Sequence, residues 1–238
     1  MAGRVALVIP RAGTGPVVTP LHSAGVDGYA HRYLPSRQGI AAGSALSTLT
    51  DLGSAKIDLA STGLGSAVIQ TANGLTYAEL TSDAGTSANY IMEGATAVYA
   101  PQVTIAAVVQ VDTGPARLYE SEALGLIKAT DGRYQASRSN GTSGAALIAG
   151  SAAGAWAFVL AQVDASALTL LVRKDTGEVS GTISNPQVGA TRPRLGGNGG
   201  SASKVARVAE ALTWNRVLTA DERTAVHTAM RAQYPVLP

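Results

Sequence analysis

Glu120 and Glu122 are a closely spaced pair of carboxylates on a segment that we expect to be a strand. Residues two apart on a strand point to the same face, and two carboxylates on either side of a glycosidic bond are the groups that hydrolyse glycosides. Two glutamates on a strand or loop are also ordinary solvated surface residues. We adopt the second interpretation, in which both side chains are exposed and the chain is not an enzyme.

Other residue types that carry chemistry lack the spacing that a site needs. His22, His31 and His227 have no metal-ligand spacing and no visible nucleophile partner, so we expect surface or interface positions for them. The glycine-rich runs GGNGG and GTSGAAL are not followed by Lys-Ser or Lys-Thr and are interpreted as loops. Trp156 and Trp214 lie in apolar runs, which favours packing over ligand stacking. The chain has no cysteine, which excludes disulfides and thiolate metal sites.

The amino-acid composition limits the fold classes and the classes of binding partner that this chain can have. A chain of 238 residues with 14% charged residues and one Phe must build its core from Val, Leu, Ile and Ala, which is typical of a β-rich domain. The net charge is only +2, and the basic residues are too sparse for a nucleic-acid footprint. We expect no signal peptide and no membrane span, because no apolar run has the required length or flanks.

The clearest local signal is the segment Val205–Tyr234, which has the pattern of an apolar strand, an Asn-Arg corner and a capped helix. Thr219 and Glu222 form a capping box at the helix start, and Pro235 stops the helix. An apolar stripe predicts that the helix lies against a sheet; it consists of Val226, Ala229, Met230 and Tyr234.

Apolar and polar residues do not alternate regularly within the strand Val205–Trp214, which predicts that both faces of the strand are covered. One face is expected to carry Ala206, Val208, Glu210, Leu212 and Trp214. We also expect Glu210 and Arg216 to form a structural ion pair that joins the strand to the corner.

Short strands separated by turn signals recur from Ile57 onward, as in all-β sandwiches. The predicted strands are 67–71, 76–80, 103–111, 117–121, 125–129, 134–138, 145–149, 156–163, 168–173, 177–183 and 205–214. Turns at Asp164–Ser166 and Asp175–Gly177 predict an antiparallel meander over 156–183. Asn198-Gly-Gly is interpreted as a flexible loop.

Residues 1–35 are rich in Pro and Gly and show no sustained period, whereas residues 39–53 could hold a short helix or turns. Apolar residues are interleaved over residues 1–35, which low-hydrophobicity disorder would not contain. We therefore predict an extended N-terminal arm that anchors the protein and is ordered by a neighbouring subunit.

In their order, these elements resemble the laminin-G-like, concanavalin A-like jelly-roll superfamily. The resemblance rests on the meander, the Gly-Gly-Asn loop, the strand with the central Glu210 and the Asn-Arg-x-Leu-Thr-x-x-Glu pattern of Asn215–Glu222. It covers about Ile57 to the end, and in that family such an ending closes the sandwich. It implies an all-β, antiparallel jelly-roll β-sandwich over residues 57–238, with one short C-terminal helix and an arm over 1–56.

Members without a signal peptide and with a body rich in Gly, Ala, Ser and Thr look like those of tailed-bacteriophage virions. The resemblance implies a non-enzymatic structural protein of the virion, assembled in the host cytoplasm, as a capsid decoration or a tail or fibre component. Its partners would be other virion proteins, bound through the arm, and further copies of itself in a trimer or dimer. Neither nucleic acid nor membrane is an expected partner.

The alternative is a module that binds bacterial surface glycans, since sugar-binding jelly rolls use loop aromatics and polar side chains. The candidate ligand-binding residues are Tyr119, Asp131, Arg133, Tyr134 and Asn140. Asp131-Gly-Arg-Tyr is also a good hairpin turn, whose tyrosine would pack on the sheet. No cofactor is expected; Ca²⁺ stays an alternative, although no single loop holds three or four acidic residues. A glycan hydrolase is a third alternative, but its family signature is a longer acidic motif than Glu120 and Glu122.

Overall fold

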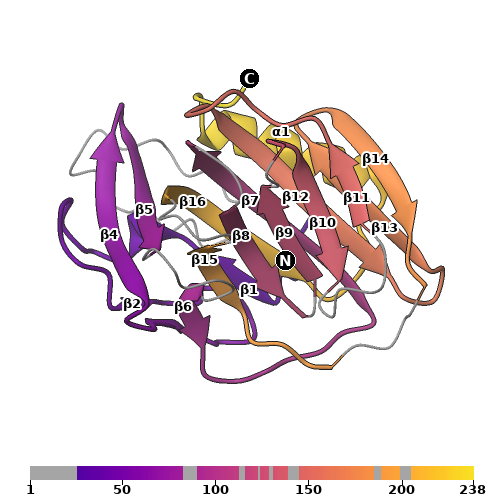
Figure 1. Cartoon of the computed structure of the whole chain (residues 1–238), viewed down its shortest axis with the longest axis horizontal. Helices are drawn as coiled ribbons and strands as arrows, with labels where there is room; N and C mark the ends of the chain where they lie inside the picture. The colour runs from indigo at the N-terminus through magenta and orange to yellow at the C-terminus, as the bar shows by residue number, and fades with distance from the viewer. Residues whose placement is uncertain are drawn as a thin grey trace, which may run out of the picture.

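The computed structural model describes residues 26–82, 90–112, 116–122, 124–128, 131–138, 145–184, 189–198 and 205–238. These residues form two antiparallel sheets packed face to face, with one α-helix on the outside (Figure 1). The predicted jelly-roll β-sandwich with a short C-terminal helix is therefore confirmed. The described part of the chain contains no helix with the length and hydropathy that a membrane crossing requires.

Sheet A has the strand order β14-β13-β12-β7-β16-β5-β4, and β1 also pairs with β16. Its strands are β1 (His31–Tyr33), β4 (Gly65–Ala72), β5 (Leu75–Ser82), β7 (Gln102–Val111), β12 (Trp156–Asp164), β13 (Thr169–Lys174), β14 (Gly177–Thr182) and β16 (Val205–Trp214). The predicted meander is β12-β13-β14, and its strands pair as consecutive neighbours.

Sheet B has the order β11-β10-β9-β8-β15-β6-β3-β2. Its strands are β2 (Thr48–Leu49), β3 (Leu59–Ser61), β6 (Tyr90–Gly94), β8 (Ala116–Ser121), β9 (Leu124–Lys128), β10 (Tyr134–Arg138), β11 (Ala145–Ile148) and β15 (Arg194–Asn198). A short 3₁₀ helix covers Pro35–Arg37, and the α-helix α1 covers Ala220–Gln233.

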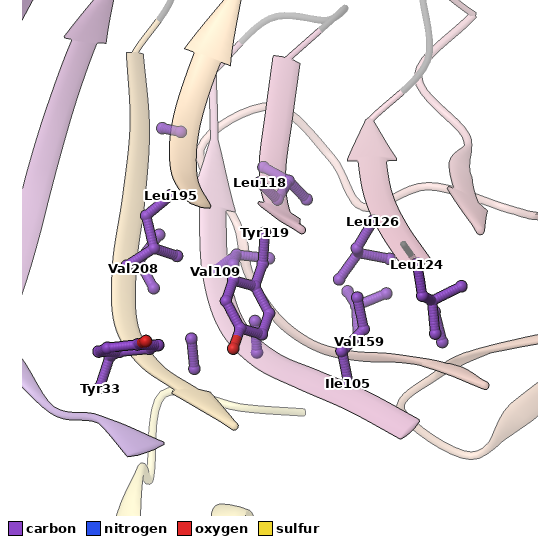
Figure 2. Packing of buried hydrophobic residues seen from close by; sticks show 14 of the residues in the cluster. Tyr33, Ile105, Val109, Leu118, Tyr119, Leu124, Leu126, Val159, Leu195 and Val208 are labelled. Carbon is purple, nitrogen blue, oxygen red and sulfur yellow. The ribbon is translucent and has the colours of Figure 1, made fainter. Parts of the chain in front are cut away.

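Two buried clusters stabilise this arrangement. The larger one lies between the sheets; Figure 2 shows Tyr33 and Tyr119 within it beside aliphatic side chains of both sheets. The second contains buried side chains of sheet A, such as Phe158 and Trp214, together with Val226 and Met230 of α1. Sheet A is thus covered on both sides, as the apolar stripe of the helix predicted.

Each strand predicted from the sequence overlaps an observed strand, but β1, β2, β3, β6 and β15 were missed. The first three have only two or three residues each, and β15 contains two glycines within the segment interpreted as a loop. Gly196 has a φ of +61°, and a Cβ added there would lie 2.6 Å from Cδ1 of Leu80. Glycine is therefore required for β15 to lie against β5, although glycine ordinarily argues against a strand.

The predicted face assignment in β16 is wrong because the strand contains a bulge. Val208 pairs with Val109 and Glu210 pairs with Val108, so that Ala209 has no partner of its own. An extra residue reverses the alternation that follows it. Ala206 and Val208 consequently belong to the cluster between the sheets, while Leu212 and Trp214 belong to the cluster under α1.

The helix start was predicted correctly, but the ion pair beside it was not. The Thr219 side chain accepts a hydrogen bond from the Glu222 backbone, and the Glu222 side chain accepts one from the Thr219 backbone. The expected pair of Glu210 with Arg216 is wrong, because Arg216 instead contacts Glu222 at 2.8 Å. Arg216 sits at the corner before the helix, within reach of the carboxylate of the capping box.

Glu210 is completely buried and has partners from two distant parts of the chain. Its carboxylate accepts hydrogen bonds from Arg32 Nε at 2.7 Å, Gln233 Nε2 at 3.0 Å and the Tyr234 hydroxyl at 2.7 Å. Burial raises the pKa of Glu210 more than the nearby Arg32 charge lowers it. This interaction connects the N-terminal segment, β16 and the end of α1.

Residues 26–56, which the sequence assigns to the arm, contribute to the sandwich. β1 pairs with β16, and Tyr33, Leu46 and Leu49 are buried between the sheets. Val26 is buried in the cluster under α1. Residues 1–25, the rest of the predicted arm, lie outside the described residues.

Glu210→Ala should lower the free energy of unfolding by about 3 kcal/mol, because it leaves the buried Arg32 guanidinium without its carboxylate. Arg216→Ala is the matched control, since it removes an arginine whose side chain is 39% exposed, and should cost less than about 1 kcal/mol. Chemical denaturation monitored by circular dichroism measures both. Equal losses in the two variants would contradict the assignment of Glu210 as the central partner.

Candidate functional site

A group of charged and aromatic side chains lies on the solvent side of sheet B, across its adjacent strands β6, β15 and β8. We call it the sheet B patch; it comprises Tyr90, Glu93, Arg117, Glu120, Arg192 and Arg194. The strand register sets its geometry. Arg194 on β15 stands opposite Glu93 on one side and Glu120 on the other.

Gly197 allows the aromatic ring of the patch to meet an arginine across β15. It stands between Tyr90 and Arg117 in the register and has no side chain to separate them. The Arg117 Cζ atom lies 5.4 Å from the Tyr90 ring centroid, and the Arg194 Cζ atom lies 4.9 Å from it. Both distances permit a cation–π interaction.

Hydrogen bonds fix the polar atoms of the patch. Glu93 accepts from Arg194 Nε at 2.7 Å and from Arg192 Nη1 at 3.0 Å. Burial opposes ionisation of Glu93, but these two hydrogen bonds outweigh it and lower its pKa. The Tyr90 hydroxyl donates to Glu120, and burial together with the charge of Glu120 raises the pKa of Tyr90.

The patch therefore offers an ordered surface of fixed donors and acceptors, with the buried Tyr90 ring, which is 7% exposed, behind the arginines. The side chains of Arg192, Arg194 and Glu93 are 48%, 29% and 25% exposed, so their remaining hydrogen-bonding capacity faces solvent. Three arginines against two glutamates leave a small positive excess. Such a surface suits hydroxyl-rich or weakly acidic ligands.

The expectation that Glu120 and Glu122 are exposed and share a face is wrong. Glu120 is 4% exposed and Glu122 is 1% exposed. Glu120 faces the patch, whereas Glu122 lies 3.4 Å from His31 on the inner side of the sandwich. Glu122 has a φ of +53° in the turn after β8, where the two-residue period of the strand no longer applies. The two carboxylates do not flank a common cleft.

Of the five predicted ligand-binding residues the structure describes four, and it does not place these four on one exposed surface. Tyr119 and Tyr134 are buried in the core between the sheets, so neither ring is available for stacking on a ligand. Arg133 and Asp131 form an exposed ion pair at 2.6 Å within the predicted turn. Asn140 lies outside the described residues.

A second polar group is buried at one end of the space between the sheets. His31 Nδ1 lies 2.8 Å from Asp51 Oδ2, and His31 Nε2 lies 3.4 Å from Glu122 Oε1. The Tyr33 ring stacks on the imidazole with a centroid distance of 5.9 Å. Because His31, Asp51 and Glu122 are at most 1% exposed, this His31 cluster is structural.

Neighbouring charges and hydrogen bonds determine the protonation of His31 and Asp51 in the His31 cluster. Burial disfavours the imidazolium of His31, but the hydrogen bonds and charges of Asp51 and Glu122 outweigh burial and raise its pKa. Asp51 also accepts backbone hydrogen bonds from Arg32, Gly53 and Ile57. Burial opposes ionisation of Asp51, yet these bonds and the His31 contact lower its pKa.

Within the described residues, no group of three or more His, Asp or Glu side chains could hold a metal ion. The candidate site is the sheet B patch, and of its six residues sequence reasoning singled out only Glu120. Tyr90 and Glu93 lie on the unpredicted β6, and Arg194 lies on the unpredicted β15. Arg192 and Arg194 stand two apart just before the buried Leu195, a weak alternation that marks a strand.

Comparison with known proteins finds solved structures of similar fold. No protein-family model matches the sequence, and no curated protein matches it. Trypanosoma rangeli sialidase is similar in structure, with a TM-score of 0.57 and 14% identity over 85% of this chain and 33% of the sialidase chain. The binding domain of botulinum neurotoxin serotype D/C has a TM-score of 0.58 and 8% identity over 87% of this chain and 53% of its own. These likenesses show the fold alone.

Replacing His31 by Asn should change the pH dependence of stability. A raised histidine pKa contributes stability that is complete below the ordinary value of 6.5 and is lost as the pH rises through the raised pKa. The stability difference between the parent and His31→Asn should therefore shrink as the pH rises from about 6 to about 9. Urea unfolding across this pH range measures it.

His227→Asn provides a control of opposite sign. Burial and the nearby Arg173 lower the pKa of His227, so its contribution is present above 6.5 and lost as the pH falls through the lowered pKa. Parallel pH profiles for the two variants would contradict the assignment of His31 as the cationic member of its cluster.

Proposed function

We propose that this chain is a non-enzymatic structural protein of a tailed-bacteriophage particle, exposed on its surface as a capsid decoration protein or a tail or fibre component. The observation that carries this proposal is the fastening of residues 26–34 to the closing strand and helix. Arg32 is bonded to Glu210, and Val26 is buried under α1. Residues 1–25 are then left for attachment to other virion proteins and to further copies of the chain.

The burial of Glu120 and Glu122 supports a role without catalysis. A glycosidase needs two carboxylates that reach the same bond from opposite sides. Here the Glu120 side chain is occupied by Tyr90, and the Glu122 side chain points toward His31. Polysaccharide turnover that disappears in Glu120→Gln would overturn this part of the proposal.

Deleting residues 1–25 should abolish incorporation into particles while leaving the sandwich folded. The deletion removes none of the described residues, so the melting temperature and the circular dichroism spectrum should stay within error of the full chain. Incorporation is measured by the protein content of purified particles assembled with each form. Full occupancy by the truncated chain would contradict anchoring through the N-terminal arm.

Glycan recognition is the second candidate function, and the sheet B patch is the observation that favours it. The patch presents the partly exposed charged groups of Arg192, Arg194 and Glu93 around the buried Tyr90 ring, and such groups can form hydrogen bonds to sugar hydroxyls. Two proteins of similar fold, a sialidase and a toxin binding domain, agree with a recognition role but do not assign a ligand. A bacterial surface glycan would suit a particle that recognises its host.

Arg192→Ala combined with Arg194→Ala should reduce glycan binding by at least about a hundredfold, because the double variant removes a charged hydrogen bond from each of two arginines and each is worth about 1.5–3 kcal/mol. Arg133→Ala is the matched control, since Arg133 is an exposed arginine paired with a carboxylate outside the patch. Glycan-array screening followed by titration of the best glycan measures both. Loss of binding in Arg133→Ala alone would place the site at the predicted loop instead.

A further inference from the structure

The edge strand β14 lacks the protection that the other sheet edges have. All six of its residues pair with β13 without a bulge, and no other described strand pairs with it. Its sequence, Gly-Glu-Val-Ser-Gly-Thr, contains neither Lys nor Pro. Regular edges without such residues are templates for another strand.

The other edges are short or covered. At the opposite edge of sheet A, β4 is bridged by Ala45 and bonded to the backbone of Ser44 and Leu46. The edges of sheet B are β2, with two residues, and β11, with four. Among the described residues, β14 is therefore the longest edge with an open side.

Ion pairs hold β14 in place. Glu178 on this strand contacts Arg223 of α1 at 2.9 Å and Arg173 of β13 at 2.8 Å. The hydrogen bonds from Arg223 and Arg173 lower the pKa of Glu178 despite its partial burial. On the same strand the Val179 side chain is 40% exposed. Because β14 is already ordered, pairing of another strand with it costs little conformational entropy on the side of β14.

The chain itself contains a segment suited to this edge. Residues 5–9, Val-Ala-Leu-Val-Ile, are apolar and mostly β-forming, carry no charge and are ended by Pro10. The link from Pro10 to residue 25 reaches about 50 Å when extended. It contains Pro16 and Pro20, and prolines stiffen a link and favour a target beyond the chain's own surface.

We propose that residues 5–9 of one copy add as a strand to the β14 edge of a second copy. This exchange gives a self-associated protein whose subunits are linked by main-chain hydrogen bonds, with Val179 as an apolar contact. It does not require the virion role or glycan binding. Because every copy has one arm and one open edge, reciprocal exchange between two copies gives a closed dimer, and exchange in one direction gives a ring where the rotation between copies closes.

The test measures the molar mass of the full chain by light scattering over a range of concentrations. The full chain should form a defined oligomer at micromolar concentration, and deletion of residues 1–10 or Val179→Lys should weaken association at least tenfold. The lysine places a positive charge on the edge, opposite the arginines at positions 4 and 11 that flank the apolar run. Val236→Lys is the matched control, because Val236 is 38% exposed and lies after α1; it should leave the oligomer unchanged.

A direct binding experiment separates an effect on the interface from an effect on folding. A peptide of residues 3–11 should bind the chain that lacks residues 1–10, and Val179→Lys should abolish binding while retaining the parent melting temperature. A full chain that is monomeric at all concentrations would overturn the proposal. So would an arm that protects the β14 amides from hydrogen exchange in the monomer, since it would then dock on its own edge.

Discussion

The structure depends on the carboxylate of Glu210, a charge with no access to solvent. Taking an ion from water costs several kcal/mol, and Arg32, Gln233 and Tyr234 offset this cost only when they converge on it. They come from the N-terminal segment and from the end of α1. If either segment leaves sheet A, the buried carboxylate of Glu210 loses part of the hydrogen bonding that offsets its burial. The N-terminal segment and α1 therefore bind sheet A cooperatively, through the charge of Glu210 as well as through apolar packing.

The bulge at Ala209 determines which face of the molecule is left open. Without the extra residue, Glu210 would share a face with Val208 and point between the sheets. The bulge turns it toward α1, so the helix and residues 26–34 cover sheet A. No described helix covers the outer face of sheet B, and the patch of charged and aromatic side chains lies there. A local irregularity in one strand therefore fixes where a ligand could approach.

What the sequence predicted depends on how local the signal was. The turn before β14 and the capping box of Thr219 and Glu222 involve neighbouring residues, and both were found. The Arg32–Glu210 contact joins residues 178 positions apart, and no pattern of spacing indicates it; Arg216, six residues from Glu210, was the nearer and wrong partner. Tyr90 was missed because β6 begins with three apolar residues in a row and shows no alternation, and Arg194 was missed because β15 contains two glycines. Glu122 was misplaced because its positive φ ends the alternation on which the prediction rested.

The geometry of the sheet B patch also limits how strongly a single copy could bind. Arg194 already donates to Glu93, and the Tyr90 ring has an arginine on each of two sides, so a ligand uses only the donors that these contacts leave. Such an ordered surface loses little entropy on binding, but each new hydrogen bond replaces one with water and, for a charged donor, contributes only about 1.5–3 kcal/mol. Modest affinity per site becomes strong attachment when several sites act together, because the second contact is intramolecular. In the proposed oligomer, a patch built mainly on strands would keep the sites at fixed spacing, which is the condition that such multivalent binding requires.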